Sequence, residues 1–141
     1  MVNISKESLC QKDLHRLFTQ LNSTVGRLSA KQSEDFLSGL LGTEEKVMLA
    51  KRLAAIIMLV HGQSIYRVAT SLKVSTSTSK NYKNQLKSGQ YDLLLNSITK
   101  QKKRYLELLE TIDSILHLGG ALPHYGQTLA SEEFKRNKRL G

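Results

Sequence analysis

The chain has 141 residues and a formal net charge of +9, a size that fits one domain with an appended helix and tail. It holds one cysteine and no run of about 18 apolar residues, which excludes an internal disulfide and a membrane-spanning helix. One proline, no tryptophan and few aromatic residues are typical of an all-helical protein. Because the N-terminus lacks the apolar core of a secretion signal, we expect a cytoplasmic protein.

The first 60 residues predict three helices. Leucines and a phenylalanine at helical spacing indicate a helix over residues 6–21, broken by the polar stretch 22–26. Ser29 to Gln32 has the form of a capping box and opens a second helix that ends at Leu41. The third helix, Thr43 to His61, is apolar nearly all round and must be buried in a core or against another chain. Since three short amphipathic helices are a thin cover for it, we predict a homodimer that pairs through this helix and the N-terminal helices, with Leu53, Ile56, Ile57 and Val60 in its core.

Residues 64–87 predict a helix-turn-helix. Ser64 and Ser75 have the residue type of N-caps, and they open two short helices separated by the turn at residues 73–75. The second helix carries hydroxyl, amide and lysine side chains on one face and no acid. A helix-turn-helix presents such a face to the major groove of DNA. A small solvated helical hairpin is the alternative interpretation.

The charge distribution supports DNA binding, because residues 61–105 carry nine basic side chains and one acid, Asp92. We assign the start of the second helix to base edges, namely Thr76, Ser77, Lys80 and Asn81. Side chains around it are assigned to phosphates, with the basic run 100–104 as a weaker addition: Ser64, Arg67, Lys73, Thr78, Lys83 and Lys87.

After Gly89, apolar residues at a spacing of three to four predict one long helix over residues 91–118, with a possible break in the basic run 99–104. The glycine-rich and charged remainder predicts a mobile basic tail. The predicted organisation is therefore a DNA-binding domain over residues 1–89, a helical extension over 90–118 and a tail over 119–141.

No catalytic or metal-binding pattern is present. The four histidines are scattered, and Cys10 has no partner at the spacing of metal ligands. No glycine-rich phosphate loop follows a strand. We therefore expect no enzyme activity, no metal and no cofactor.

The stretch from Phe36 to Lys87, about a third of the chain, has the layout helix, glycine, serine, helix, turn, helix. Its characteristic residues are Leu40, Leu41, Thr43, Glu44, Glu45, Arg52, Ile56, Ile57, Leu59, Gly62, Ser64, Arg67, Leu72, Val74, Ser75, Thr78, Leu86 and Lys87. In these residues the stretch resembles the Trp repressor-like superfamily of bacterial helix-turn-helix regulators. The resemblance implies an all-α, intertwined homodimer that binds double-stranded operator DNA and regulates transcription. The long helix after Gly89 extends beyond this pattern.

One departure from the family concerns the corepressor. Family members that bind tryptophan hold its carboxylate with an arginine on the long helix and another in the reading helix, followed by glycine. Arg52 matches the first position, but Asn81 stands at the second and Tyr82 at the glycine. The tyrosine ring would fill space that a ligand needs. We therefore expect no tryptophan corepressor.

Two other functions fit parts of the sequence. The chain can be a DNA-recognition subunit of transposase-type mobile-element machinery, since such proteins use similar units followed by a long helix. It can also be a helical adaptor whose long C-terminal helix binds a protein, which predicts no affinity for DNA at physiological salt.

Overall fold

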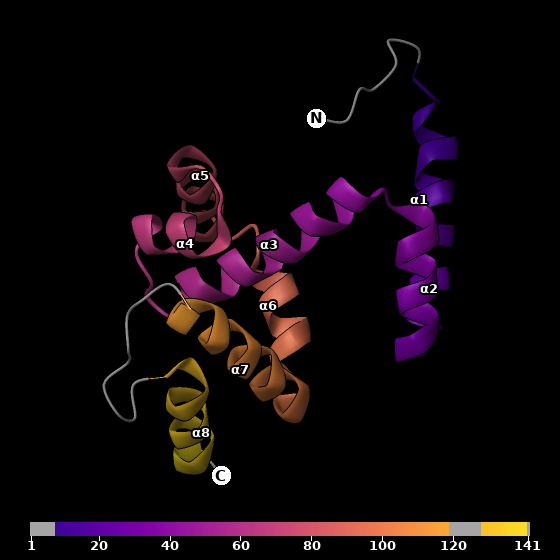
Figure 1. Ribbon diagram of the computed structural model, residues 1–141. Coiled ribbons are helices and arrows are strands. Elements are labelled where there is room, and N and C mark those ends of the chain that lie inside the picture. Colours follow the sequence, from indigo (N-terminus) through magenta and orange to yellow (C-terminus); the bar gives the residue numbers. More distant parts are fainter. Residues whose placement is uncertain (1–7, 119–127, 141) are drawn as a thin grey trace. The chain divides into compact units, whose positions relative to one another are not determined.

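The computed structural model of the chain describes residues 8–118 and 128–140, which form eight α-helices and no strand (Figure 1). The predicted all-α class is therefore confirmed for these residues. In chain order the helices are α1 (Gln11–Gly26), α2 (Ala30–Leu40), α3 (Thr43–Val60), α4 (Ile65–Leu72), α5 (Thr76–Lys87), α6 (Asp92–Thr99), α7 (Lys102–Leu118) and α8 (Leu129–Leu140). No helix within the described ranges is long and apolar enough to cross a membrane.

The chain divides into two compact units, residues 1–46 and 47–141. The boundary falls inside α3, whereas the sequence predicted a boundary at residue 89. The helices α6, α7 and α8 do not form a separate appendage. They share one hydrophobic core with α3 and α4, in which Leu109, Ile112 and Leu129 contact the same cluster as Ile57 and Val68.

The first unit contains α1, α2 and the start of α3. The capping box at the start of α2 is confirmed: Ser29 Oγ accepts a hydrogen bond from the Gln32 amide (3.3 Å), and Gln32 Oε1 accepts one from the Ser29 amide (2.9 Å). The predicted break at residues 22–26 is wrong, since α1 continues to Gly26. The Thr24 hydroxyl donates to the Gln20 carbonyl within the helix (2.9 Å), so this polar residue is accommodated on an exposed helix face.

The second half of α3 lies in the core of the second unit. Ile56 and Ile57 are 1% and 0% exposed in the single chain, while Val60 is 42% exposed and Leu53 is half-buried. The burial that led us to place Ile56 and Ile57 in a dimer core is therefore supplied by the chain's own helices. Sequence reasoning underestimated that cover because it treated α7 as a separate extension.

The predicted long helix over residues 91–118 is also wrong, since α6 ends at Thr99 and α7 begins at Lys102. The break lies in the basic run, at the place where a possible interruption was predicted. It changes the direction of the chain, so that Tyr105, Leu109 and Ile112 on α7 enter the core.

Residues 129–140 form α8, where the sequence predicted a mobile tail; residues 119–127 of that tail lie outside the described part of the chain. The start of α8 is held by Asp113 on α7, whose carboxylate oxygens accept hydrogen bonds from the Leu129 amide (2.9 Å) and the Ala130 amide (3.0 Å). Leu129 itself is buried against the core. The tail prediction missed α8 because its cap comes from 16 residues away in sequence.

Candidate nucleic-acid interface

The helices α4 and α5 are joined by a three-residue turn, and each begins at a serine, as predicted. Ser64 Oγ accepts a hydrogen bond from the Arg67 amide (3.1 Å), and Ser75 Oγ accepts one from the Thr78 amide (3.0 Å). In the turn, Lys73 adopts the left-handed conformation (φ 56°, ψ 49°) that commonly ends a helix. These local bonds fix where both helices start, and therefore which side chains lie in the first turn of α5.

One side of α5 is fixed to the rest of the unit. Ser79 is fully buried, and its hydroxyl donates a hydrogen bond to the Ile65 carbonyl at the start of α4 (2.9 Å). Tyr82 and Leu86 are partly buried against the core. Because this side of α5 is held, the rotation of the helix about its axis is fixed as well.

The opposite side of α5 is exposed. All four side chains assigned to base edges are open to solvent, and α5 contains no acidic residue. We call this surface the α5 face; it consists of Thr76, Ser77, Lys80 and Asn81. The fold brings them together on one helix, with two lysines, Lys73 and Lys87, exposed at or beyond its two ends.

The other residues assigned to phosphates have partners inside the unit or are less exposed. The Arg67 guanidinium donates through Nη2 to the Leu116 carbonyl on α7 (3.1 Å), and Ser64 Oγ caps α4. Thr78 Oγ1 lies 2.8 Å from Ser75 Oγ, and Lys83 is half-buried. Arg67 therefore fixes α4 to the last turn of α7, a role that sequence spacing did not indicate.

A lysine that sequence analysis did not single out contacts the turn. Lys51 on α3 donates from Nζ to the Lys73 carbonyl (3.2 Å), which stabilises the left-handed turn residue. The two residues are 22 positions apart, so no local pattern connects them. The signal that remained in the sequence was a pair of cations, Lys51 and Arg52, in the middle of a largely apolar helix.

Arg52 and Tyr82 lie against one another beside α5. The Arg52 guanidinium carbon is 5.9 Å from the centre of the Tyr82 ring, within the range of a cation–π contact. A hollow of about 360 Å³ borders both side chains and is also lined by Gln85 and Tyr91. The Tyr91 hydroxyl donates to Gln85 Oε1, and burial raises the pKa of that hydroxyl above its usual value of 10.0. The guanidinium of Arg52 is thus already in contact with the ring of Tyr82.

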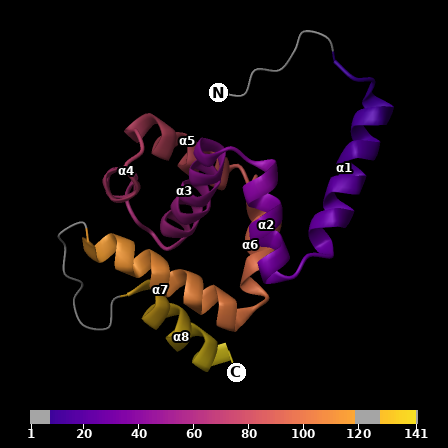
Figure 2. The same ribbon diagram turned by 45° about the vertical axis from the view of Figure 1, so that its right-hand side comes forward.

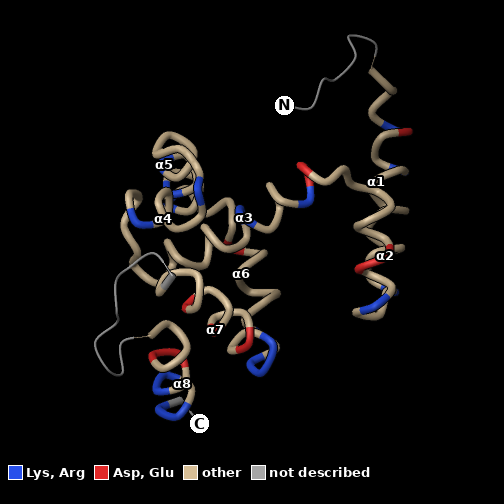
Figure 3. Tube along the Cα trace, in the orientation of Figure 1, with Lys and Arg blue, Asp and Glu red and all other residues tan. Residues whose placement is uncertain are grey.

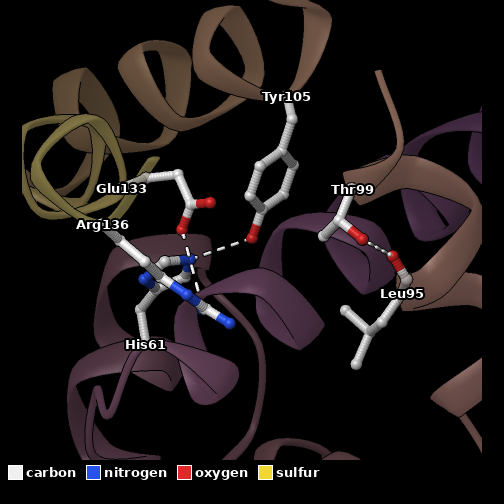
Figure 4. Close-up of polar contacts among 6 residues, drawn as sticks. All are labelled: His61, Leu95, Thr99, Tyr105, Glu133 and Arg136. Carbon is white, nitrogen blue, oxygen red and sulfur yellow. Dashed lines mark hydrogen bonds and ion pairs between the residues drawn. The ribbon is translucent and has the colours of Figure 1, made fainter. Parts of the chain in front are cut away.

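A second polar group joins the end of α3 to α7 and α8 (Figure 4). His61 Nε2 lies 2.9 Å from the Tyr105 hydroxyl, and Glu133 on α8 is buried next to them with its Oε2 3.9 Å from Arg136 Nη1. Burial lowers the pKa of His61 below 6.5 and raises the pKa of Tyr105 above 10.0, so both groups are neutral at pH 7. A cavity of about 340 Å³ borders the group on the side of Thr99.

Neither polar group forms a metal site, because no three histidine, cysteine, aspartate or glutamate side chains of the described ranges converge on one point. Comparison of the chain with models of known protein families, with curated proteins and with solved structures finds no match. The geometry and charge of the α5 face are therefore the features that bear on the function.

Proposed function

We propose that this protein is a sequence-specific, double-stranded DNA-binding transcriptional regulator, in which α4, the turn and α5 act as a helix-turn-helix. The observation that carries the proposal is the α5 face. It is exposed and free of acids, and it stands on a helix whose other side is fixed by the buried Ser79. A rigid polar helix face of this kind fits the major groove, where its N-terminal residues read base edges.

The exposed side chains have the chemistry for this role. Asn81 has an amide that pairs bidentately with adenine, and Lys80 donates to the acceptors of guanine; each contact is worth about 1–3 kcal/mol of discrimination. The two hydroxyls, Thr76 and Ser77, donate to either bases or phosphates. Lys73, Lys83 and Lys87 neutralise phosphates, whereas Ser64 and Arg67 position α4.

The first unit supports dimerisation. No side chain of α1 or α2 is buried, although α1 carries a stripe of large apolar residues of which Leu17 and Phe18 are 56% and 54% exposed. Monomeric proteins rarely leave apolar surface of this extent in water. A second copy of the chain provides a matching apolar surface, and a symmetric dimer presents two α5 faces to half-sites about 34 Å apart. The other exposed apolar residues of the first unit are Leu9, Leu21, Val25, Leu37 and Leu40.

A selection of bound sites from random duplex DNA tests the main proposal. We expect one enriched motif with two-fold symmetry, and we expect Asn81→Ala to relax the preference at one base pair per half-site while it spares non-specific affinity. Asn96→Ala, which changes the same residue type on an exposed position of α6, serves as the control. An equal loss of affinity on all sequences would show that Asn81 contacts only the DNA backbone.

We also propose that L-tryptophan does not regulate this protein. Asn81 cannot replace the second arginine, and the loss of one charge-assisted hydrogen bond removes about 1.5–3 kcal/mol. A millimolar ligand has only about 4 kcal/mol in total. The contact of Arg52 with the Tyr82 ring would have to be displaced as well. Calorimetry should detect no binding of L-tryptophan; micromolar binding that tightens the DNA complex would contradict this.

The exposed apolar residues of α1 and α2 also favour a second candidate, an adaptor that binds another protein. The two candidates differ in their affinity for DNA. An adaptor binds its partner through the first unit and has no measurable affinity for duplex DNA at physiological salt. Fluorescence anisotropy with a labelled duplex at about 150 mM salt separates the two candidates.

A further inference from the structure

The helices α7 and α8 carry a second basic surface. Three cations lie in the first turn of α7, and four lie in the second half of α8, of which Arg136 is paired with Glu133; the other six side chains are all exposed. Among the residues that the structure describes, the single ion pair joins Arg136 to Glu133, so none of the six has an acidic partner. We call these six residues the basic end: Lys102, Lys103, Arg104, Lys135, Lys138 and Arg139.

The two groups of cations lie at the same end of the second unit because α8 runs antiparallel to α7 (Figure 3). The start of α8 is bonded to Asp113, in the second half of α7. Further along α8, Arg136 and Asn137 line the same cavity as Tyr105, in the first turn of α7. The second half of α8 therefore lies on the side of the first half of α7, and Figure 2 shows the two helices running in opposite directions.

The cations of α7 have no stabilising role in their own helix. The N-terminus of a helix carries partial positive charge, which favours acids and disfavours cations in the first turn. Four of the other helices, α1, α3, α6 and α8, have an acid in the first turn, whereas α2, α4 and α5 have none. The first turn of α7 has none. An anion bound from outside the chain would relieve this repulsion.

The basic end is separate from the α5 face. Figure 3 shows the lysines and arginines of α8 and of the start of α7 at the opposite end of the second unit from α4 and α5, with α3 and the body of α7 between them; Figure 2 gives the same arrangement. A duplex bound along the α5 face therefore leaves the basic end open to another polyanion.

Phosphate groups of nucleic acid fit this surface better than a membrane does. A helix that binds at a membrane surface buries a continuous apolar face in the lipid. The apolar side of α8 is already used, since Leu129 is 2% exposed and Ala130 packs against the core, and Phe134 is a single exposed aromatic residue. What α8 offers to solvent is mainly charge.

We propose that the basic end binds the phosphate backbone of a second duplex segment, without sequence preference, so that the protein bridges two stretches of DNA. The proposal rests on the proposed function for the first segment, which the α5 face binds. The second surface is independent of it, because it involves other helices and reads no bases.

A capture experiment tests the bridge. A target duplex is fixed to beads, the protein is added, and a labelled duplex of unrelated sequence is offered. The test variant is Lys102→Gln, Lys103→Gln, Lys138→Gln, Arg139→Gln. The control changes the same number of exposed cations in the first unit: Lys12→Gln, Arg16→Gln, Arg27→Gln, Lys31→Gln. We expect wild type and control to capture the labelled duplex and the test variant to lose at least ten-fold in capture, with target affinity within about three-fold of wild type.

The salt dependence and the melting temperature provide further readouts. In the test variant the slope of log affinity against log salt for non-specific DNA should become shallower by about 0.9 for each phosphate that is no longer neutralised. Lys102→Gln with Lys103→Gln should raise the melting temperature slightly, because it removes repulsion from the helix terminus. A variant that melts earlier than wild type would contradict the dipole argument.

The outcomes distinguish this proposal from the proposed function. Capture that persists in the test variant, or is lost equally in the control, overturns the bridge. Anionic vesicles that bind to the basic end while duplex DNA does not also overturn it. If Lys80→Ala with Asn81→Ala leaves selective target binding unchanged, the α5 assignment fails. If non-specific binding still depends on the basic end in that case, the second surface stands.

Discussion

The two units of the chain contrast in how they use amphipathic helices. In the second unit, apolar side chains of α3, α4 and α7 are buried against one another, and Ile57, Val68 and Leu109 are fully inaccessible. In the first unit, α1 has a comparable apolar stripe and buries none of it. The comparison teaches that an apolar stripe does not specify its partner: the second unit finds partners within the chain, and the first unit leaves its stripe exposed.

The largest effect should come from a charge placed in the core of the second unit. Ile57→Asp buries an unpaired carboxylate among residues that have no exposed surface, which should cost about 4 kcal/mol or more and unfold the unit. Circular dichroism should show reduced helicity at about 25 °C. A folded variant with a melting temperature within a few degrees of wild type would mean that this position is not core.

A charge placed on the apolar stripe of the first unit should have a different result. We expect Leu17→Asp with Phe18→Asp to separate the dimer into monomers, and to leave the second unit folded, because neither side chain is buried in the single chain. Sedimentation measures the mass, and the near-ultraviolet signal of the tyrosines, all of which lie in the second unit, reports its packing. A monomeric, folded wild type at micromolar concentration would remove the dimer proposal.

The attachment of α8 gives an intermediate effect. The carboxylate of Asp113 accepts two backbone hydrogen bonds and is 7% exposed, so Asp113→Ala should cost about 1–3 kcal/mol. Hydrogen exchange should show α8 opening while α4 and α5 keep their protection. Asp13→Ala, which changes a more exposed aspartate in α1, is the matched control and should change the exchange of α8 very little.

The smallest effect concerns pH. Burial lowers the pKa of His61 in the folded protein below the unfolded value of 6.5, so the unfolded state binds more protons between these two values. Stability should therefore fall as the pH falls from about 7 through 6.5 toward the folded pKa. His61→Gln should melt with a weaker pH dependence than wild type between about pH 7.5 and 5.5. His15→Gln, which changes an exposed histidine of the first unit, should keep the wild-type dependence.

Local patterns in the sequence were sufficient to predict where three helices start and which side chains form the α5 face. The N-caps Ser29, Ser64 and Ser75 bond to amides three residues away, so the pattern contains the whole interaction. The exposed polar face of α5 was predictable for a similar reason, because helical spacing places Thr76, Ser77, Lys80 and Asn81 on neighbouring positions. The roles of these side chains in binding DNA stay a prediction.

Sequence patterns did not predict the hydrogen bonds between residues that are far apart in the chain. Arg67 was assigned to phosphate from its charge, yet its guanidinium bonds to the Leu116 carbonyl, 49 residues away. The cap of α8 by Asp113 and the contact of Lys51 with the turn belong to the same class. Each depends on how helices pack, which residue type and spacing do not contain.

The sequence by itself determined the all-α class, the starts of α2, α4 and α5, and the acid-free face of α5, because these follow from side chains within one or two helical turns. The tertiary structure decided that Ile56 and Ile57 are buried by helices of the same chain and that α6 ends before α7 begins at Lys102. It also decided that residues 129–140 form a helix packed against α7. It placed the cations of α7 and α8 at the same end of the unit, away from α4 and α5 (Figure 3). The physical reason is that the core and the charged surfaces are each built from side chains of several helices. Only the packing of the helices determines which side chains come together.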